Sequence, residues 1–355
     1  SPDQTLQIAQ ELYEKKLTTY PRTDARVLSS AVAKVIDRNL KGIAASGIED
    51  EGNGSIAAFA NEILAGSAWK NIGNTRYTND KAITDHYAII PTGSGLKTLQ
   101  SLSPTARKVY DTIVRRFLAV FYPPAVYSKT SVTITVGNES FFATSRILTE
   151  EGWLKVTGGE KNKKGVDLSG IKKGDRLNID DLSVKEGETS PPKRYTSGSM
   201  ILAMENAGQL IEDESLREMI RGSGIGTSAT RAEILKKLVT IKYLNLNKKT
   251  QVITPELLGE MVYDTVNLSI RALLNPDLTA SWEKGLTGVA EGTITTDEYM
   301  IKLRGFIERR CAAVMGLENQ WQLRQCYDAA ARYYKKPSTG GSKQTGTPKS
   351  SSKKK

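Results

Sequence analysis

The apolar positions of this chain follow a helical period through most of its first 124 residues. After Ser1 they recur three or four residues apart, at Leu6, Ala9, Leu12 and Tyr13. Ser1 and Gln4 can form a capping box around Pro2 at the first helical position, so we expect a helix ending near Lys15. Similar patterns predict helices at about 30 to 41 and 55 to 65, with an acidic, glycine-rich loop between them. A fourth should begin at Ser103-Pro104 and end before Pro123-Pro124.

After Pro123-Pro124 the period changes from 3.6 to 2, which indicates strands. Apolar residues from Val132 to Val136 alternate with threonines, Gly137-Asn138 supplies a hairpin turn, and Phe141 to Leu148 can return as the partner strand. We expect a β-rich unit that continues to the turn signal at Pro191-Pro192. Its remaining parts should be Trp153 to Val156, a loop from Gly158 to Gly165, and strands near Arg176 to Ile179 and Leu182 to Lys185.

From Tyr195 the pattern is helical again. Helices are predicted at Ser199 to Ala207 and Ala229 to Val239, followed by a hairpin that pairs Leu244 to Leu246 with Gln251 to Ile253. Two helices followed by a hairpin are typical of a winged helix. Further helices should lie at about 255 to 266 and 295 to 315.

The amino-acid composition excludes several classes of protein. At 355 residues the chain should form two or three cores, and no apolar run approaches the roughly 18 residues that a membrane span needs. Two cysteines, Cys311 and Cys326, exclude a disulfide framework or a zinc ribbon, and fit a reducing cytoplasm. One histidine, His86, excludes a histidine-rich metal site.

The net charge of +11 is concentrated at one end. The last 21 residues carry seven lysines and no acid, which leaves only +4 on the other 334 residues. Such a tail cannot bury apolar surface and should be disordered. Its charge suits nucleic-acid phosphates, and a solubilising tail explains the composition equally well.

Tyr20 is the first candidate for chemistry. Pro21 keeps Tyr20 out of helical geometry, so Leu17 to Asp24 should be extended, with Arg22 on the same side as Tyr20. A phenol with a pKa near 10 is a poor nucleophile, and a neighbouring cation favours its phenolate and can bind a phosphate through two hydrogen bonds. Taken alone, Tyr20 is more simply a half-buried packing residue and Arg22 an ordinary surface cation.

Two further segments hold candidate residues. His86 lies in a polar stretch before the apolar run that ends at Pro91, which would fix its imidazole near a surface where it can donate to phosphate. The glycine-rich loop 222–227 enters a helix whose first turn carries Thr230 and Arg231, and free N–H groups at such a helix start bind anions. A lone histidine is more often structural, and many such loops merely cap helices.

Three motifs, taken in their order along the chain, resemble those of the type IA DNA topoisomerases. Within this family they are most similar to bacterial topoisomerase III. They are Thr18-Thr19-Tyr20-Pro21-Arg22-Thr23-Asp24, His86-Tyr87-Ala88-Ile89-Ile90-Pro91-Thr92 and Gly224-Ile225-Gly226-Thr227-Ser228-Ala229-Thr230-Arg231. The segment 278–283 also looks like a family segment, and the resemblance spans about residues 1 to 315.

The resemblance implies a role for each matching residue. Tyr20 would cleave one DNA strand and hold its 5′ phosphate as a phosphotyrosine, while Arg22 steadies the phosphate and His86 acts as hydrogen-bond donor or proton carrier. The residues implied to line the groove for single-stranded DNA are Gly224, Gly226, Thr227, Thr230 and Arg231. The reaction would be ATP-independent strand passage, relaxing or decatenating single-stranded or underwound DNA.

The resemblance also implies a multidomain α+β fold. A helical cap domain would span 1–124, a β-rich arch 125–194, a winged-helix-like base 195–334 and a disordered basic tail 335–355. Members of the family carry, before the tyrosine, a Toprim domain that binds Mg²⁺. Because Tyr20 is preceded by only 19 residues, we expect a C-terminal portion of such an enzyme, with Mg²⁺ bound by an absent Toprim domain supplied in cis or trans.

Two other functions remain open. The chain could be a non-catalytic module that binds single-stranded DNA through phosphates and stacking on aromatic rings. It could also be a tyrosine recombinase, although that chemistry uses several arginines and histidines ahead of a tyrosine near the C-terminus. We expect a cytoplasmic protein without membrane contact.

Overall fold

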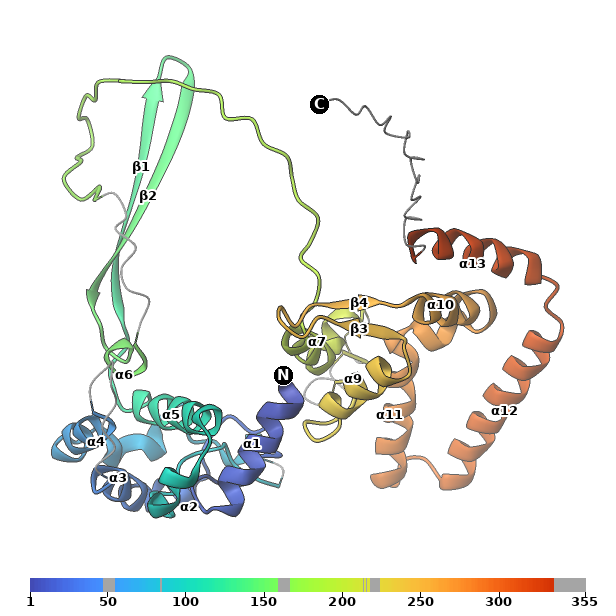
Figure 1. Cartoon of the computed structure of the whole chain (residues 1–355), viewed down its shortest axis with the longest axis horizontal. Coiled ribbons are helices and arrows are strands. Elements are labelled where there is room, and N and C mark those ends of the chain that lie inside the picture. Colours follow the sequence, from blue (N-terminus) through green and yellow to red (C-terminus); the bar gives the residue numbers. More distant parts are fainter. Residues whose placement is uncertain are drawn as a thin grey trace, which may run out of the picture. The chain divides into compact units, whose positions relative to one another are not determined.

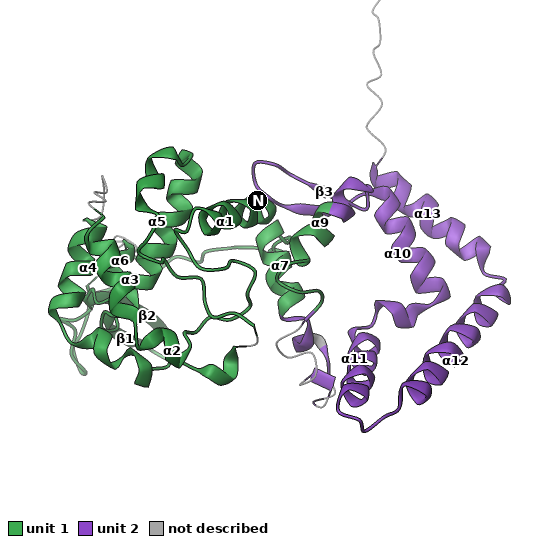
Figure 2. Cartoon of the chain, turned by 90° about the horizontal axis from the view of Figure 1, so that it is seen from below, with its two compact units in different colours: residues 1–205, 225–236 green, residues 206–224, 237–355 purple. Residues whose placement is uncertain are grey.

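The computed structural model describes residues 1–46, 55–83, 85–158, 167–212, 214, 216–217 and 224–334. The chain divides into two compact units (Figure 2): Ser1–Glu205 with Ile225–Lys236, and Asn206–Gly224 with Lys237–Lys355. The predicted acidic loop from Ser46 to Gly54 apart from Ser46, most of the loop from Gly158 to Gly165, and the basic tail lie outside the described residues.

Helices make up most of the first unit. Its α-helices are α1 (Pro2–Glu14), α2 (Ser30–Ala33), α3 (Ile36–Ala44), α4 (Ile56–Ala65), α5 (Pro104–Ala119), α6 (Leu154–Thr157) and α7 (Ser197–Glu205). Three 3₁₀ turns accompany them: η1 (Ala68–Asn74), η2 (Asp80–Ala82) and η3 (Leu96–Ser101). The predicted helix start at Ser1 is confirmed by half of the capping box, since the Ser1 side chain accepts a hydrogen bond from the Gln4 amide. At the predicted start of α5, the Ser103 side chain accepts one from the Ala106 amide. The helix predicted at 30 to 41 is instead two helices separated at Lys34 and Val35.

One hydrophobic core joins these helices. Its most deeply buried side chains include Leu12, Leu17, Ile36, Leu40, Ile43, Ile56, Ile72, Val114, Leu118 and Val156. They come from α1, α3, α4, α5, α6, η1 and the chain that follows α1. The end of α1 and this following chain are therefore anchored at Leu12 and Leu17. This anchoring places Tyr20 close to a rigid support.

The predicted hairpin is confirmed. Strands β1 (Val126–Val136) and β2 (Glu139–Glu150) pair antiparallel, with Val136 opposite Glu139 across the two-residue turn. Figure 1 shows them as one long ribbon.

The rest of the predicted β-rich unit is wrong in two places. The stretch expected as part of a β-rich unit at Trp153 to Val156 contains the helical turn α6, because Val156 fills the core and its carbonyl accepts a hydrogen bond from Arg115 Nη1 at 2.8 Å. Within the described residues, the segments expected as strands near 176–179 and 182–185 pair with nothing. Leu182 is 70% and Val184 92% exposed. Alternating side chains favour a strand, but the strand forms only where a partner backbone is present.

The second unit is also mostly helical. Its elements are η4 (Ala207–Leu210), β3 (Leu244–Leu246), β4 (Ile253–Pro255), α10 (Leu257–Ser269), η5 (Arg271–Leu274), α11 (Pro276–Ala290), α12 (Thr296–Met315) and α13 (Gln320–Tyr334). Helix α9 (Arg231–Thr240) begins in the first unit and ends in the second. A hairpin forms as predicted after Leu244 to Leu246, but its second strand begins at Ile253, two residues later than the predicted Gln251. The helices α11 and α13 were not predicted. No helix in the described ranges has both the length and the apolar composition that crossing a membrane requires.

Candidate active site

Two segments far apart in sequence form the base of the candidate site. The chain leaves α1 through Lys16, a non-glycine residue with a φ of 61°, and then runs extended beside residues 88–92. The Thr19 amide donates to Ile90 O at 3.0 Å, and the Thr92 amide donates to Leu17 O at 3.0 Å. The extended geometry is therefore confirmed at Leu17 to Thr19, where the histidine segment supplies the partner.

Two threonine side chains lock this pairing. The Thr19 hydroxyl donates to Ala88 O at 3.2 Å and accepts from the Ile90 amide at 3.0 Å. The Thr23 hydroxyl donates to His86 O at 2.8 Å. Because these bonds flank Tyr20 and hold the backbone of His86, the backbone positions from which the two candidate side chains extend are fixed.

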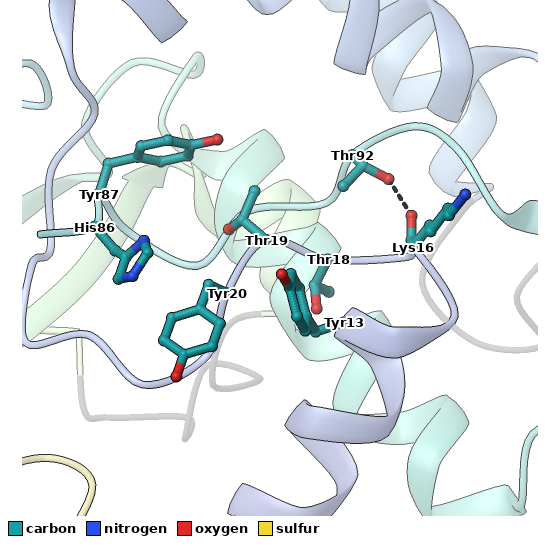
Figure 3. A pocket seen from close by; sticks show the side chains of 8 residues that line it. All are labelled: Tyr13, Lys16, Thr18, Thr19, Tyr20, His86, Tyr87 and Thr92. Atoms are coloured by element: carbon teal, nitrogen blue, oxygen red, sulfur yellow. Dashed lines mark hydrogen bonds between the residues drawn. The ribbon is translucent and has the colours of Figure 1, made fainter.

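The structure brings Tyr20 and His86 together. Their ring centroids lie 4.4 Å apart with an angle of 43° between the planes. Tyr13 packs edge-on against the other side of Tyr20, with centroids 5.3 Å apart and an angle of 83°. Figure 3 shows the imidazole beside the Tyr20 ring. Tyr20 is half-buried and His86 is exposed, so both rings are open to a ligand from solvent.

These rings border a pocket of about 330 Å³ (Figure 3). It is lined by Tyr13, Lys16, Thr18, Thr19, Tyr20, His86, Tyr87 and Thr92. A hydrogen bond of 2.5 Å from the Thr92 hydroxyl to Lys16 O closes one side. Aromatic rings can stack on a nucleobase, while hydroxyls and a lysine can bind phosphate, so the lining suits a nucleotide.

Sequence reasoning missed part of this lining. It assigned Tyr13 to the apolar stripe of the first helix, yet this side chain is 40% exposed and packs on Tyr20. The signal was present, because Tyr13 stands at the exposed end of α1, seven residues before Tyr20. Arg22 is exposed and does not line the pocket, so its predicted contact with a phosphate stays a prediction.

The glycine-rich loop lies just before α9. Gly224 and Gly226 have φ angles of 61° and 69°, which explains why glycine suits both positions. The Ile225 amide donates to Met204 O at 2.8 Å. The Thr227 amide donates to the Thr230 hydroxyl at 2.9 Å, so these two threonines form one polar turn at the start of α9. Gly222 and Ser223 lie outside the described residues.

Arg231 faces inward. Its side chain is 3% exposed, its Nε donates to Ile225 O at 3.2 Å, and its Nη2 donates to Gly226 O at 3.1 Å. Its Nη1 lies 3.4 Å from Asp24 Oδ1. Its predicted position on the wall of a DNA groove stays a prediction.

The described residues do not fit a Mg²⁺ site. Within the described ranges no three histidine, cysteine, aspartate or glutamate side chains gather closely enough to hold a metal ion. Asp180 and Asp181 are exposed, and Glu49-Asp50-Glu51 lie outside the described residues. We therefore derive no step through a metal ion.

Comparison with known proteins decides the family. The family model described as DNA topoisomerase matches residues 1–301. The chain belongs to the type IA DNA topoisomerase family. Its three motifs thus lie in a topoisomerase sequence, and all three fall within the matched range.

Curated relatives point to the topoisomerase III branch. DNA topoisomerase 3 of Bacillus licheniformis is 32% identical over 318 residues, which cover 87% of this chain and 41% of that protein. DNA topoisomerase 3 of Bacillus subtilis is 33% identical over 316 residues, covering 86% and 41%. The chain thus spans about two fifths of the length of the curated relatives it matches.

A solved structure shares the fold. Topoisomerase I of Thermotoga maritima superposes with a TM-score of 0.51 at 23% identity, over 87% of this chain and 45% of that one. The predicted combination of helices and sheets is therefore confirmed for the fold as a whole.

Proposed function

We propose that this type IA topoisomerase chain carries the tyrosine that cleaves DNA. The observation that carries the proposal is the placement of Tyr20 against His86, 4.4 Å between ring centroids, in a pocket built by two of the family's motifs. The Tyr20 oxygen would form a bond to a backbone phosphorus while the bond to the 3′ oxygen breaks. The phenol loses its proton, the 3′ oxygen gains one, and the 5′ phosphate stays on Tyr20.

This exchange explains how a strand can be resealed without a nucleotide cofactor. One phosphate ester replaces another, so the bond energy is conserved and the reverse attack of the 3′ hydroxyl restores the strand. His86 would donate a hydrogen bond to the phosphate, and Arg22 would offset its charge. Lys16, which the sequence did not suggest, lines the same pocket and adds a second cation.

The loop before α9 would bind the strand away from the cleavage point. Gly224 and Gly226 allow close approach of a phosphate to the backbone, and the turn made by Thr227 and Thr230 supplies hydroxyl groups at a helix start. The substrate would be single-stranded or underwound DNA. The products would be relaxed or decatenated DNA, with Mg²⁺ held by a Toprim domain in cis or trans.

The test measures covalent capture of DNA. The chain is incubated with end-labelled single-stranded DNA and Mg²⁺, alone and with a separately produced Toprim domain, and adducts are separated under denaturing conditions. We expect an adduct in the complemented reaction that Tyr20→Phe abolishes. Tyr13→Phe is the matched control, since it removes a hydroxyl from the neighbouring ring of the same pocket. It should leave the adduct in place.

Each other outcome has a meaning. An adduct that survives Tyr20→Phe contradicts the proposal. DNA binding that weakens steeply with salt, without an adduct in any condition, supports the non-catalytic DNA-binding module. An adduct through a 3′ phosphate supports recombinase chemistry.

A further inference from the structure

The buried guanidinium of Arg231 links two segments that lie far apart in the sequence. It donates to the carbonyls of Ile225 and Gly226 on its own loop, and it meets Asp24, four residues after Tyr20. The arginine is 3% exposed and Asp24 is 46% exposed. A DNA phosphate therefore cannot reach the guanidinium without displacing these partners.

Burial makes these contacts necessary. A guanidinium removed from water is strongly destabilising unless hydrogen bonds and a counter-charge replace its hydration. The two loop carbonyls and the Asp24 carboxylate provide this replacement. Since the donors of a guanidinium lie in one plane in a fixed fork, binding three acceptors at once also fixes where those acceptors lie.

Asp24 is itself tied to the pocket. The preceding residue, Thr23, donates to His86 O at 2.8 Å and accepts from the Ala25 amide at 3.0 Å. The Ala88 amide donates to Val27 O at 2.9 Å. The Thr23 hydroxyl before Asp24 and the Val27 carbonyl after it are therefore both bonded to the segment that carries His86, so a displacement of Asp24 would move the backbone that holds Tyr20 and His86.

We propose that Asp24 and Arg231 form a positioning pair, which holds the loop 224–227 at a fixed place relative to Tyr20. This inference rests on the proposed function, because the pair sets where a strand held by the loop meets the tyrosine. Arg231 then makes no contact with DNA. The loop N–H groups and the hydroxyls of Thr227 and Thr230 then bind the phosphate.

The alternative, a direct contact between Arg231 and a phosphate, makes the opposite prediction for Asp24. If Arg231 bound DNA, removing the carboxylate would free its charge and tighten DNA binding. If the pair only positions the loop, Asp24→Ala should leave affinity and salt dependence nearly unchanged and should slow cleavage. A misplacement near 1 Å can slow a reaction by about a hundredfold, so we expect a loss of about ten- to hundredfold.

The experiment separates binding from cleavage in the same variants. Binding of fluorescein-labelled oligothymidylate to the chain is measured by anisotropy at several salt concentrations. Adduct formation is followed in single turnover with the Toprim domain and Mg²⁺. Asp24→Asn serves as the conservative variant, since it keeps an acceptor oxygen for Arg231 and should recover part of the rate. Asp37→Ala is the control, because it removes an aspartate paired with Lys41 inside α3.

The outcomes are distinct. Unchanged binding with a slowed rate in Asp24→Ala, partly restored in Asp24→Asn and absent in Asp37→Ala, supports the pair. Tighter binding in both Asp24 variants, or a wild-type rate in Asp24→Ala, overturns it while the proposed function stands. If the wild-type chain forms no adduct, the proposed function fails and the inference falls with it. Because Asp24→Ala removes the counter-charge of a buried guanidinium, urea unfolding of each variant is measured first. Asp24→Asn, which keeps an acceptor oxygen, tests the pair if Asp24→Ala does not fold.

Discussion

At the scale of single residues, a glycine holds the histidine segment in place. Gly42 of α3 lies against Gly93, and a Cβ at position 42 would lie 2.6 Å from Gly93 Cα and closer still to its carbonyl oxygen. Asn39, one turn earlier, donates from Nδ2 to Pro91 O at 2.8 Å. Helix α3 therefore supports the end of the segment whose backbone pairs with the strand leading to Tyr20.

Gly42→Ala should destabilise the first unit by overpacking this contact. We expect a loss of about 1–3 kcal/mol in the free energy of unfolding, measured with urea, because backbone on both sides must move. Gly73→Ala is the matched control, since its Cβ would meet only Ala33 Cβ at 3.9 Å. Equal losses in the two variants would contradict the role of close packing at Gly42.

At the scale of elements, a carboxylate joins η2 to the start of α2. The Ser30 hydroxyl donates to Asp80 at 2.6 Å and the Ser30 amide donates at 2.8 Å. These bonds, the hydroxyl first, lower the pKa of Asp80 from its ordinary value of 3.8. The contact holds the chain just after Leu28, whose amide donates to Tyr77 O at 2.7 Å. It thus fixes the far end of the segment that starts at Tyr20.

The lowered pKa of Asp80 predicts a pH dependence of stability. Because the folded state favours the carboxylate, its contribution is fully present above about pH 3.8 and is lost as the pH falls through the lower, folded-state pKa. Asp80→Asn should therefore be less stable than wild type at pH 6, and the difference should shrink towards pH 3. Urea unfolding at both pH values checks this, and a difference that grows on acidification would contradict it.

At the scale of the whole molecule, the two units bury apolar side chains unequally. In the first unit one cluster joins six α-helices, and burial in it raises the pKa of Tyr110 to about 12. Among the described residues of the second, the buried apolar side chains are Ala207, Ile211, Ile253, Ala280 and Ala330, and α10 and α12 have no buried side chain. Met315 at the end of α12 is 87% exposed.

This inequality predicts different local stabilities. Amide hydrogen exchange of the chain should be slowest in α1, α3 and α5 and much faster in α12, because opening a helix without buried side chains exposes little apolar surface. Mass spectrometry of peptides from each helix measures this directly. Equal protection of α5 and α12 would show that contacts other than apolar burial stabilise α12.

Short sequence patterns were sufficient to predict those elements that depend on interactions between neighbouring residues. The caps at Ser1 and Ser103, the non-helical backbone of Tyr20 before Pro21, and the two-residue turn of the hairpin depend on neighbours within a few residues. For the same reason the sequence indicated Tyr20 and His86 as candidates, since each motif is a continuous stretch of chain.

Contacts between distant segments were decided only by the tertiary structure. It placed Tyr13 on Tyr20, turned Arg231 inward to Asp24 across 207 positions, made α6 a helical turn over the core, and left Leu182 and Val184 without a strand partner. Periodicity reports which face of a segment is apolar. Which other segment meets that face depends on the free energy of packing the whole chain, and no short window of sequence contains it.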